Sequence, residues 1–189
     1  MTYNAARRED GRDQGSGFRE ADRCVPKWVG EVSAAAQTAV ILAAGRGTRL
    51  GGLGTRIPKG FLRLGEQTII EDSIDKLVAR GIRHIVVVTG HLVHFYRELA
   101  ARRDGLLETV HNTKYAELGS FYSLQVGLER AGGAGPLLLL ESDLVYEPRA
   151  LEEVLADPRE DLVLLSGPTR SGDEVWVETD GDGRLLAMS

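Results

Sequence analysis

The sequence predicts an α/β fold: a Rossmann-like, mostly parallel sheet with helices on both faces and a hairpin near its C-terminal end. Short, continuously apolar runs alternate with segments whose apolar residues recur at helical spacing. The runs lack the polar alternation of a half-exposed strand, which indicates burial on both faces. The final residues instead read as strand, turn and strand. Strands that alternate with helices form a parallel sheet through right-handed crossovers.

Five apolar runs are predicted to be strands. The first ends in glycine-rich sequence, and the second, His-Ile-Val-Val-Val, is rich in the β-branched residues that favour strands. The fourth consists of four leucines. In chain order, the predicted strands are residues 39–42, 84–88, 106–110, 137–140 and 162–165.

Four segments between these runs carry an apolar stripe at the spacing of a helix. Gly81 is well placed to end the first helix, and Pro148 to begin the last. The predicted buried faces are Ile70, Ile74, Leu77 and Val78, then Leu92, Phe95 and Leu99, then Phe121, Leu124 and Leu128, and finally Leu151, Val154 and Leu155.

The first 36 residues differ in composition from the rest. Residues 1–36 are rich in Arg, Asp, Glu and Gly, and their apolar residues are few and scattered. Because too little apolar surface is available to offset the entropy of ordering, we expect a mostly disordered extension. One domain over residues 37–189 should follow it. In its last part, residues 174–179 and 184–188 predict two strands of a hairpin around the turn residues between them.

Composition excludes several classes of protein. The 189 residues suffice for one α/β domain, and the formal net charge of −5 argues against a nucleic-acid partner. The one cysteine, Cys24, excludes an internal disulfide and a cysteine-based zinc site. No apolar stretch reaches the ~20 residues that span a membrane, and no apolar signal core follows the N-terminal charges. The sequence therefore predicts a cytoplasmic protein with no membrane partner.

The segment after the first strand reads Leu-Ala-Ala-Gly-Arg-Gly-Thr-Arg-Leu, and Ile-Pro-Lys follows a little further on. Gly45 and Gly47 would let the backbone pass close to a ligand and direct N–H groups at phosphate oxygens. Arg49 and Lys59 would supply the positive charge that a triphosphate requires. Pro58 stiffens the chain just before Lys59. The segment therefore predicts a polyphosphate-binding loop.

Two familiar phosphate-binding motifs do not fit this segment. The P-loop requires Lys and then Ser or Thr after its second glycine, and no window matches. The dinucleotide fingerprint requires a third glycine where Leu50 stands, and an acidic residue at the end of the second strand. That strand is followed by Gly90 and His91 instead. The glycine pair alone is weak evidence for nucleotide binding, but its combination with Arg-Leu and Pro-Lys is strong evidence for it.

The combined motif resembles the MobA-like nucleotidyltransferases that activate sugar phosphates, phosphocholine and related compounds. The order Asn, Lys-Tyr, then Tyr-Ser-Leu over residues 112–124 is similar to the phosphocholine and 2-aminoethylphosphonate cytidylyltransferases, including those of phosphonate pathways. The resemblance implies a nucleotide-diphospho-sugar transferase (GT-A-like) fold. It also implies an Mg²⁺-dependent transferase that moves a nucleoside monophosphate, CMP from CTP, to a small phosphate or phosphonate and releases pyrophosphate. Phosphocholine, 2-aminoethylphosphonate and 2-hydroxyethylphosphonate are the implied acceptors.

The resemblance also implies roles for particular residues. Arg49, Lys59 and Asp143 would be the catalytic residues, with Asp143 ligating Mg²⁺. Asn112 would contact the substrate. Apart from the resemblance, the aromatic rings of Tyr122 and Trp176 could contact a substrate ammonium group through cation–π attraction. Nucleotide contacts would fall on Leu42, Ala43, Ala44, Gly45, Arg46, Gly47, Thr48, Gly90 and Ser123, with the last two near the base or ribose.

Asp143 follows the four-leucine strand directly. It could simply begin a solvated turn. In an open parallel sheet, however, ligands bind outside the carboxyl ends of the strands where strand order reverses. If the first and fourth strands are neighbours, the glycine loop and Asp143 meet over one crevice, where a carboxylate facing a triphosphate suits Mg²⁺. Glu141 points to the same side of its strand and would support that site.

Other polar and aromatic residues give weaker signals. His91 and His94 lie three residues apart but lack a third metal ligand, so ordinary packing roles are expected. Asp173 and Glu174 could bind a substrate ammonium or belong to a solvated turn. Phe121 is expected in the core, whereas Tyr115 could join an aromatic wall.

The sequence leaves several alternatives open. Chains of the resembled family usually continue for several tens of residues beyond the point that matches Ser189, and that part carries a second acidic metal ligand. This sequence is then a fragment, or its metal site is incomplete, or another chain, such as a homodimer partner, completes it. Inositol-phosphate or sugar-phosphate nucleotidyltransferases, a non-catalytic nucleotide-binding or regulatory module, and a metal-dependent glycosyltransferase are the competing functions.

Overall fold

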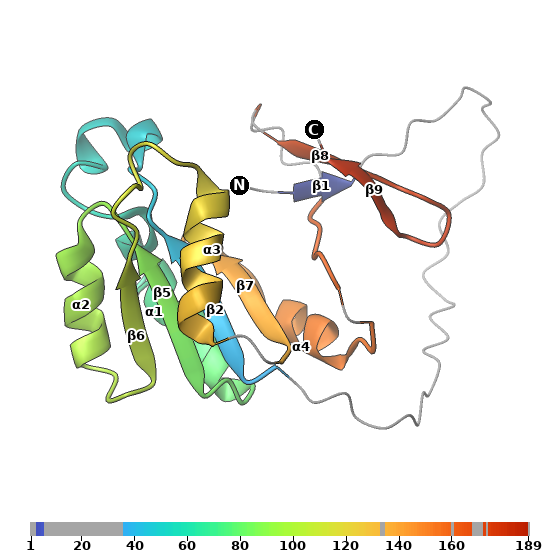
Figure 1. Ribbon diagram of the computed structural model, residues 1–189, viewed down its shortest axis with the longest axis horizontal. Helices are drawn as coiled ribbons and strands as arrows, with labels where there is room; N and C mark the ends of the chain where they lie inside the picture. Colours follow the sequence, from blue (N-terminus) through green and yellow to red (C-terminus); the bar gives the residue numbers. More distant parts are fainter. Residues whose placement is uncertain are drawn as a thin grey trace. The chain divides into compact units, whose positions relative to one another are not determined.

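The structure, a computed structural model, describes residues 3–5, 36–132, 135–159, 161–167, 172 and 174–188 (Figure 1). The chain divides into two compact units. One contains Ser33–Glu160, and the other combines Met1–Val32 with Asp161–Ser189. Each unit is described by itself below. In the described residues, no helix has the length and apolar character needed to cross a membrane.

The larger unit contains a four-stranded parallel sheet in the order β6-β5-β2-β7. Its strands are β2 (Thr38–Ala43), β5 (His84–Thr89), β6 (Leu107–His111) and β7 (Leu137–Glu141). The first four predicted strands are therefore confirmed. In the register, Leu42 lies opposite Val88 on one side and Glu141 on the other. All four carboxyl ends consequently share one edge of the sheet.

Helices cover both faces of this sheet, as predicted (Figure 1). On one face lie α1 (Ile69–Ala79), α2 (Val93–Ala101) and α4 (Pro148–Ala156), and on the other lies α3 (Ser120–Ala131). The first face packs a large core that includes Ile41, Ile70, Ile74, Leu77, Val87, Tyr96, Leu99 and Leu151. The α3 face has a smaller core built on Val40, Leu42, Val86 and Val88.

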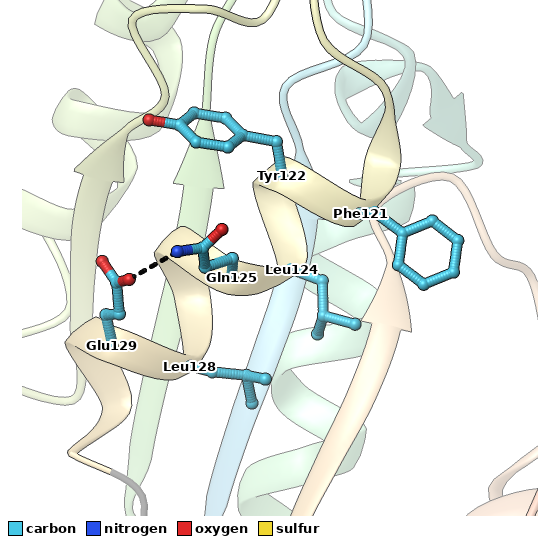
Figure 2. A pocket seen from close by; sticks show the side chains of 6 residues that line it. All are labelled: Phe121, Tyr122, Leu124, Gln125, Leu128 and Glu129. Atoms are coloured by element: carbon cyan, nitrogen blue, oxygen red, sulfur yellow. Dashed lines mark hydrogen bonds between the residues drawn. The ribbon is translucent and has the colours of Figure 1, made fainter.

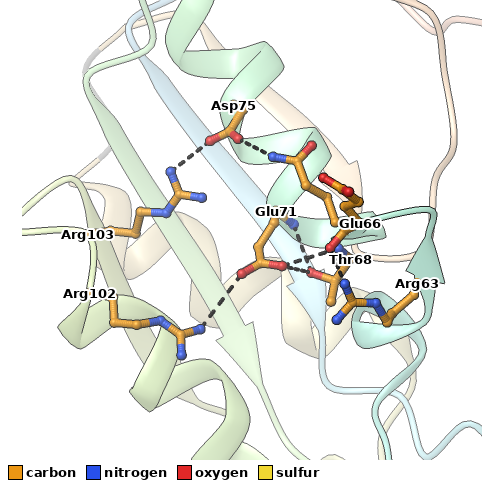
Figure 3. Close-up of polar contacts among 8 residues, drawn as sticks. Arg63, Glu66, Thr68, Glu71, Asp75, Arg102 and Arg103 are labelled. Carbon is orange, nitrogen blue, oxygen red and sulfur yellow. Dashed lines mark hydrogen bonds and ion pairs between the residues drawn. The ribbon is translucent and has the colours of Figure 1, made fainter.

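A capping box fixes the start of α1 (Figure 3). The Thr68 hydroxyl accepts a hydrogen bond from the Glu71 backbone N–H, and the Glu71 carboxylate accepts from the Thr68 backbone N–H and hydroxyl. The hydrogen bonds from Thr68 lower the pKa of Glu71 despite its partial burial. Arg103 adds an ion pair at 2.7 Å to Asp75, and Arg102 lies 3.8 Å from Glu71. Local sequence thus determines where α1 begins. The two arginines that follow α2 link that segment to α1.

Helix α3 does not bury the face that the sequence predicts. Phe121 is 89% exposed and Leu128 39% exposed, whereas Ser123 and Gly127 are buried. The reason is close packing of α3 against the sheet. A Cβ on Gly127 would lie 2.6 Å from Val40 Cγ1 and 2.9 Å from a methyl group of Val88. The helix therefore packs Gly127 against the strands and keeps only Leu124 of the predicted face on the smaller core, so the expectation of a core Phe121 is wrong.

Short elements connect β2 to α1. They are two 3₁₀ helices, η1 (Thr48–Leu53) and η2 (Lys59–Phe61), and the two-residue strands β3 (Arg63–Leu64) and β4 (Gln67–Thr68). The two strands pair antiparallel. This stretch carries most of the predicted phosphate-binding residues.

The other unit contains the predicted hairpin. Strand β8 (Val175–Thr179) pairs antiparallel with β9 (Leu185–Met188) and parallel with β1 (Tyr3–Ala5). The Asp180 carboxylate accepts hydrogen bonds from the backbone N–H groups of Asp182 and Arg184, which closes the turn. The hairpin prediction is confirmed.

Two expectations outside the main sheet have different outcomes. The predicted strand over residues 162–165 is wrong. Val163 and Leu164 are more than half exposed, and no described strand pairs with them. An apolar run becomes a strand only where a neighbour completes its backbone hydrogen bonds. Of the expected N-terminal extension, only residues 3–5 and Ala36 are described, so the rest of that expectation, with Cys24, lies outside the described residues.

Candidate active site

The carboxyl edge of the main sheet brings the predicted motifs together. Strand β2 leads through Ala44 into the glycine loop, and β7 leads through Ser142 to Asp143. The two exits are tied directly, because the Ser142 backbone N–H donates a 3.0 Å hydrogen bond to the Leu42 carbonyl. The first and fourth predicted strands are therefore neighbours, as the crevice argument requires.

The glycine loop folds into a tight turn that leads into η1. Gly47 has a φ of +63°, a left-handed conformation that favours glycine, and its carbonyl accepts a 2.9 Å hydrogen bond from Leu50 N–H. Gly54 packs on this turn so closely that a Cβ would collide with the Gly47 carbonyl. His91 lies 3.1 Å through Nε2 from the Gly54 carbonyl. Glycines at these positions thus allow a compact loop over the sheet edge.

Lys59 meets Asp143 beside this turn. The distance from Lys59 Nζ to Asp143 Oδ2 is 3.1 Å, and the two side chains are 34% and 25% exposed. A Cβ on Gly47 would be 3.6 Å from Lys59 Cγ, so the glycine turn and the ammonium stem are neighbours. Glycine is also required next to Lys59: a Cβ on Gly60 would lie 2.8 Å from the Ser142 carbonyl oxygen. This close approach presses η2 against the Asp143 segment.

A cavity of about 190 Å³ opens beside the loop. Gly90 makes its wall compact, because a Cβ there would lie 2.6 Å from Tyr115 and 2.7 Å from the Ala44 carbonyl. Helix α3 begins at this wall without a side-chain cap on its first N–H groups. Such N–H groups need partners from solvent or a ligand. The lining residues are Leu42, Ala44, Gly45, Tyr115, Leu118, Gly119, Ser120, Ser123 and Glu141.

Asn112 supports the cavity wall through Ser123. Its side chain is fully buried, its Nδ2 donates a 3.0 Å hydrogen bond to the Ser123 hydroxyl, and its Oδ1 accepts one from the Lys114 backbone N–H. Asn112 therefore holds Ser123 in the wall, and its expected contact with the substrate stays a prediction.

Glu141 provides the acidic group of the cavity lining. Burial is the main reason that the pKa of Glu141 is raised, and the nearby Asp143 charge raises it further, while Lys59 acts in the opposite direction. A carboxylate in this position accepts hydrogen bonds from donor groups and disfavours phosphate. Phosphates therefore fit the Lys59 end of the site better than the Glu141 wall.

The donor set at Asp143 suits a magnesium ion that arrives with a nucleotide. Among the described residues, no three His, Cys, Asp or Glu side chains cluster in a way that could hold a metal. Mg²⁺ commonly binds through one or two carboxylates together with substrate phosphates. Asp143 beside the glycine turn would meet that requirement if a nucleotide phosphate bound there. His91 contacts the Gly54 carbonyl, and the ring centroids of His94 and Phe95 lie 4.7 Å apart in a tilted arrangement. Both histidines therefore have packing roles.

Other predicted residues lie apart from the cavity. Arg46, Thr48 and Arg49 are exposed around the glycine turn. Tyr122 lines a different, open hollow of about 500 Å³ on the outer side of α3 (Figure 2). Its ring lies 5.5 Å from Lys114 Nζ. Trp176 is in β8 of the other unit and is 41% exposed. The substrate roles of Tyr122 and Trp176 stay predictions, and Asp173 lies outside the described residues.

Part of the cavity wall was not predicted from the sequence. Leu118, Gly119 and Ser120 line the cavity but were not among the predicted site residues. A signal existed: Gly-Ser precedes a helical pattern just after a predicted strand, so the start of that helix had to lie at the carboxyl edge of the sheet.

Comparisons with known proteins agree with this geometry. Residues 39–182 match the family described as the MobA-like NTP transferase domain, and the chain therefore belongs to that family. It is 34% identical over 148 residues to CMP-5'-(3-aminopropyl)phosphonate synthase of Streptomyces rubellomurinus, over 78% of this chain and 23% of the relative. It is 31% identical over 155 residues to 2-aminoethylphosphonate cytidylyltransferase of Lancefieldella rimae, over 79% and 59%.

A solved structure agrees as well. The CTP:phosphocholine cytidylyltransferase of Streptococcus pneumoniae superimposes with a TM-score of 0.51 and 31% identity, over 57% of this chain and 45% of that one. The predicted family and fold class are confirmed. The chain spans less than two thirds of the length of each of these proteins.

Proposed function

We propose that this protein transfers CMP from CTP to a small phosphonate or phosphate that carries a positively charged nitrogen, and releases pyrophosphate. The observation that carries the proposal is the Lys59–Asp143 pair at 3.1 Å, placed against the glycine turn at the carboxyl edge of the sheet. The relatives named above supply the base and the acceptor class, since their names contain CMP or cytidylyl and aminoalkylphosphonates.

The nucleotide would lie with its phosphates on the loop and its nucleoside in the cavity. Residues 42–48 would surround the phosphates and the sugar, with backbone N–H groups directed at phosphate oxygens. Arg49 and Lys59 would neutralise the triphosphate charge. Gly90 and Ser123 would lie along the nucleoside, because Gly90 packs the cavity wall and Ser123 lines it. The acidic Glu141 in that wall favours a neutral, donor-rich moiety over phosphate.

The reaction requires no general base. An anionic oxygen of the acceptor attacks the α-phosphorus, a new P–O bond forms, and the bond from that phosphorus to the bridging oxygen of pyrophosphate breaks. The electron pair of that bond leaves with pyrophosphate, so no proton has to move. Lys59 and the loop N–H groups would stabilise the charge that builds on the transferred group. Asp143 would hold Mg²⁺, which when bound supplies further charge neutralisation.

Lys59 and Asp143 would exchange partners on substrate binding. In the structure, the ammonium and the carboxylate satisfy one another. A triphosphate offers Lys59 several stronger acceptors, and Mg²⁺ offers Asp143 a stronger cation. The ion pair therefore balances the charges of the ammonium and the carboxylate in the free protein. It also positions both groups before the nucleotide arrives.

A pyrophosphate-release matrix tests the proposal. The full chain is mixed with Mg²⁺, each of the four nucleoside triphosphates, and 2-aminoethylphosphonate, 3-aminopropylphosphonate, 2-hydroxyethylphosphonate, phosphocholine, inositol 1-phosphate or glucose 1-phosphate. We expect release with CTP and an aminoalkylphosphonate or phosphocholine, and none without an acceptor. CTP binding without release from any mixture would contradict transfer and favour a nucleotide-binding module.

A further inference from the structure

The register of the main sheet fixes the position of Glu141 in the cavity. The residue ends β7 opposite Leu42 of β2, and both line the cavity. Leu138 and Leu140 of the same strand pack in the larger core. Because side chains alternate along a strand, Glu141 lies on the opposite face, which α3 covers. Its carboxylate is therefore a wall of the space between the strand ends and the first turn of α3.

Glu141 differs from the other partly buried carboxylates of this unit. Glu71, Glu108 and Asp143 each have a polar partner, namely Thr68, His84 and Lys59. No donor among the described residues makes a hydrogen bond or an ion pair with Glu141, which is partly buried as well. An acceptor withdrawn from water without a donor is unfavourable. The carboxylate is therefore open to donors that a ligand would bring into the cavity.

The order of the strands shows which part of a nucleotide would reach Glu141. Two residues further on, Asp143 pairs with Lys59, where the phosphates are proposed to bind. On the other side of β2, Gly90 and Tyr115 close the opposite end of the cavity. Aromatic side chains such as Tyr115 commonly stack on bases. The ribose joins the base to the phosphates, so it would lie between these two ends, beside Glu141.

A carboxylate is well suited to recognise a ribose. Its two oxygens accept hydrogen bonds, and the neighbouring 2'- and 3'-hydroxyls of a ribose can both donate. In dinucleotide-binding folds, an acidic residue takes the ribose 2'-hydroxyl. The strand after which that residue is expected, β5, ends here at Thr89, whereas β7, on the other side of β2, ends at Glu141. A 2'-deoxyribose would offer this carboxylate one donor fewer.

We propose that Glu141 is a specificity-determining residue: its carboxylate accepts hydrogen bonds from the ribose hydroxyls of CTP and so favours CTP over 2'-deoxy-CTP. This inference rests on the proposed function, since it requires a nucleotide in the cavity. The loss of one hydrogen bond to a charged group corresponds to a loss of affinity of roughly 10- to 100-fold.

The test measures the affinities of CTP and 2'-deoxy-CTP for the full chain by isothermal titration calorimetry, with Mg²⁺ present. Wild-type protein should bind 2'-deoxy-CTP ~10-fold or more weakly than CTP. In Glu141→Ala, CTP should lose more affinity than 2'-deoxy-CTP, so that the ratio of the two affinities falls below ~3. Glu141→Gln keeps one acceptor oxygen and should give an intermediate ratio. Both nucleotides are measured on one preparation, so incomplete folding of a variant affects both equally.

Glu129→Ala is the matched control. It removes an exposed carboxylate of α3 that bonds to Gln125 outside the cavity, and it should keep the wild-type ratio. A wild-type ratio near one would overturn the ribose contact alone. So would equal losses of affinity for the two nucleotides in Glu141→Ala, which would indicate a role at the metal or in the fold. A wild-type protein that binds neither nucleotide would overturn the proposed function as well.

Discussion

Helices α1 and α3 lie on opposite faces of the same sheet, yet their buried faces follow different rules. In α1, Ile70, Ile74 and Leu77 of the predicted face are fully buried, and Val78, the fourth residue of that face, is 42% exposed. In α3, the buried positions are Ser123 and Gly127, while Phe121 is 89% exposed. Most of the predicted apolar stripe of α1 lies in the core, whereas only Leu124 of the α3 stripe packs on a core.

The difference follows from what each helix does. Helix α1 begins at a capping box and serves the larger core. Helix α3 begins at the cavity, and Ser123 lines that cavity one turn before Gly127 lets the helix approach Val40. A helix that presents a small polar group to a cavity and also lies close to the sheet cannot turn its phenylalanine inward. Periodicity therefore locates core helices more reliably than helices that form a site.

The largest effect expected from this comparison is in α1. Ile74 is fully buried in the main core. Ile74→Ala removes three buried carbons and leaves a cavity, so the free energy of unfolding should fall by about 2–5 kcal/mol. Urea denaturation followed by circular dichroism measures it. A loss below about 1 kcal/mol would show that α1 does not depend on its apolar stripe as described.

A smaller effect is expected at the close contact of α3. Gly127→Ala would raise intrinsic helix propensity, but its methyl group would lie 2.6 Å from Val40 Cγ1 in a core of stiff, β-branched residues. The overpacking should outweigh the gain in helix propensity. We therefore expect the free energy of unfolding to fall by about 1–3 kcal/mol in the same denaturation experiment. If Gly127→Ala instead raised the free energy of unfolding, α3 would be able to move away from the sheet without loss of stability.

The smallest effect is expected at Phe121, which the sequence analysis placed in the core. Phe121→Ser removes an aromatic side chain that is 89% exposed. The free energy of unfolding should therefore change by no more than about 0.5 kcal/mol, as for ordinary surface positions. Equal losses for Phe121→Ser and Ile74→Ala would erase the contrast between the two helices and restore the face predicted from periodicity.

Much of the fold could be predicted because burial on both faces leaves a plain signature. The apolar runs of β2, β5, β6 and β7 and the glycine-rich segment after β2 predicted the sheet and the edge where we propose that the nucleotide binds. The proximity of Lys59 to Asp143 followed from strand order and family resemblance. Three features did not follow: the face of α3, the cavity wall at Gly119, and the lack of a strand partner for Leu164 among the described residues. Each depends on contacts between residues distant in sequence, which no local pattern records.

The central claim is that Lys59, opposite Asp143 at the glycine turn, grips the polyphosphate. Its most direct test is pyrophosphate release from CTP and 2-aminoethylphosphonate by Lys59→Ala, with Arg149→Ala as a control that removes an exposed cation paired with Glu153. Turnover should fall at least ~100-fold in Lys59→Ala, because one preorganised charge stabiliser is lost, and should be unchanged in Arg149→Ala. A folded Lys59→Ala protein with near-normal turnover would contradict the account.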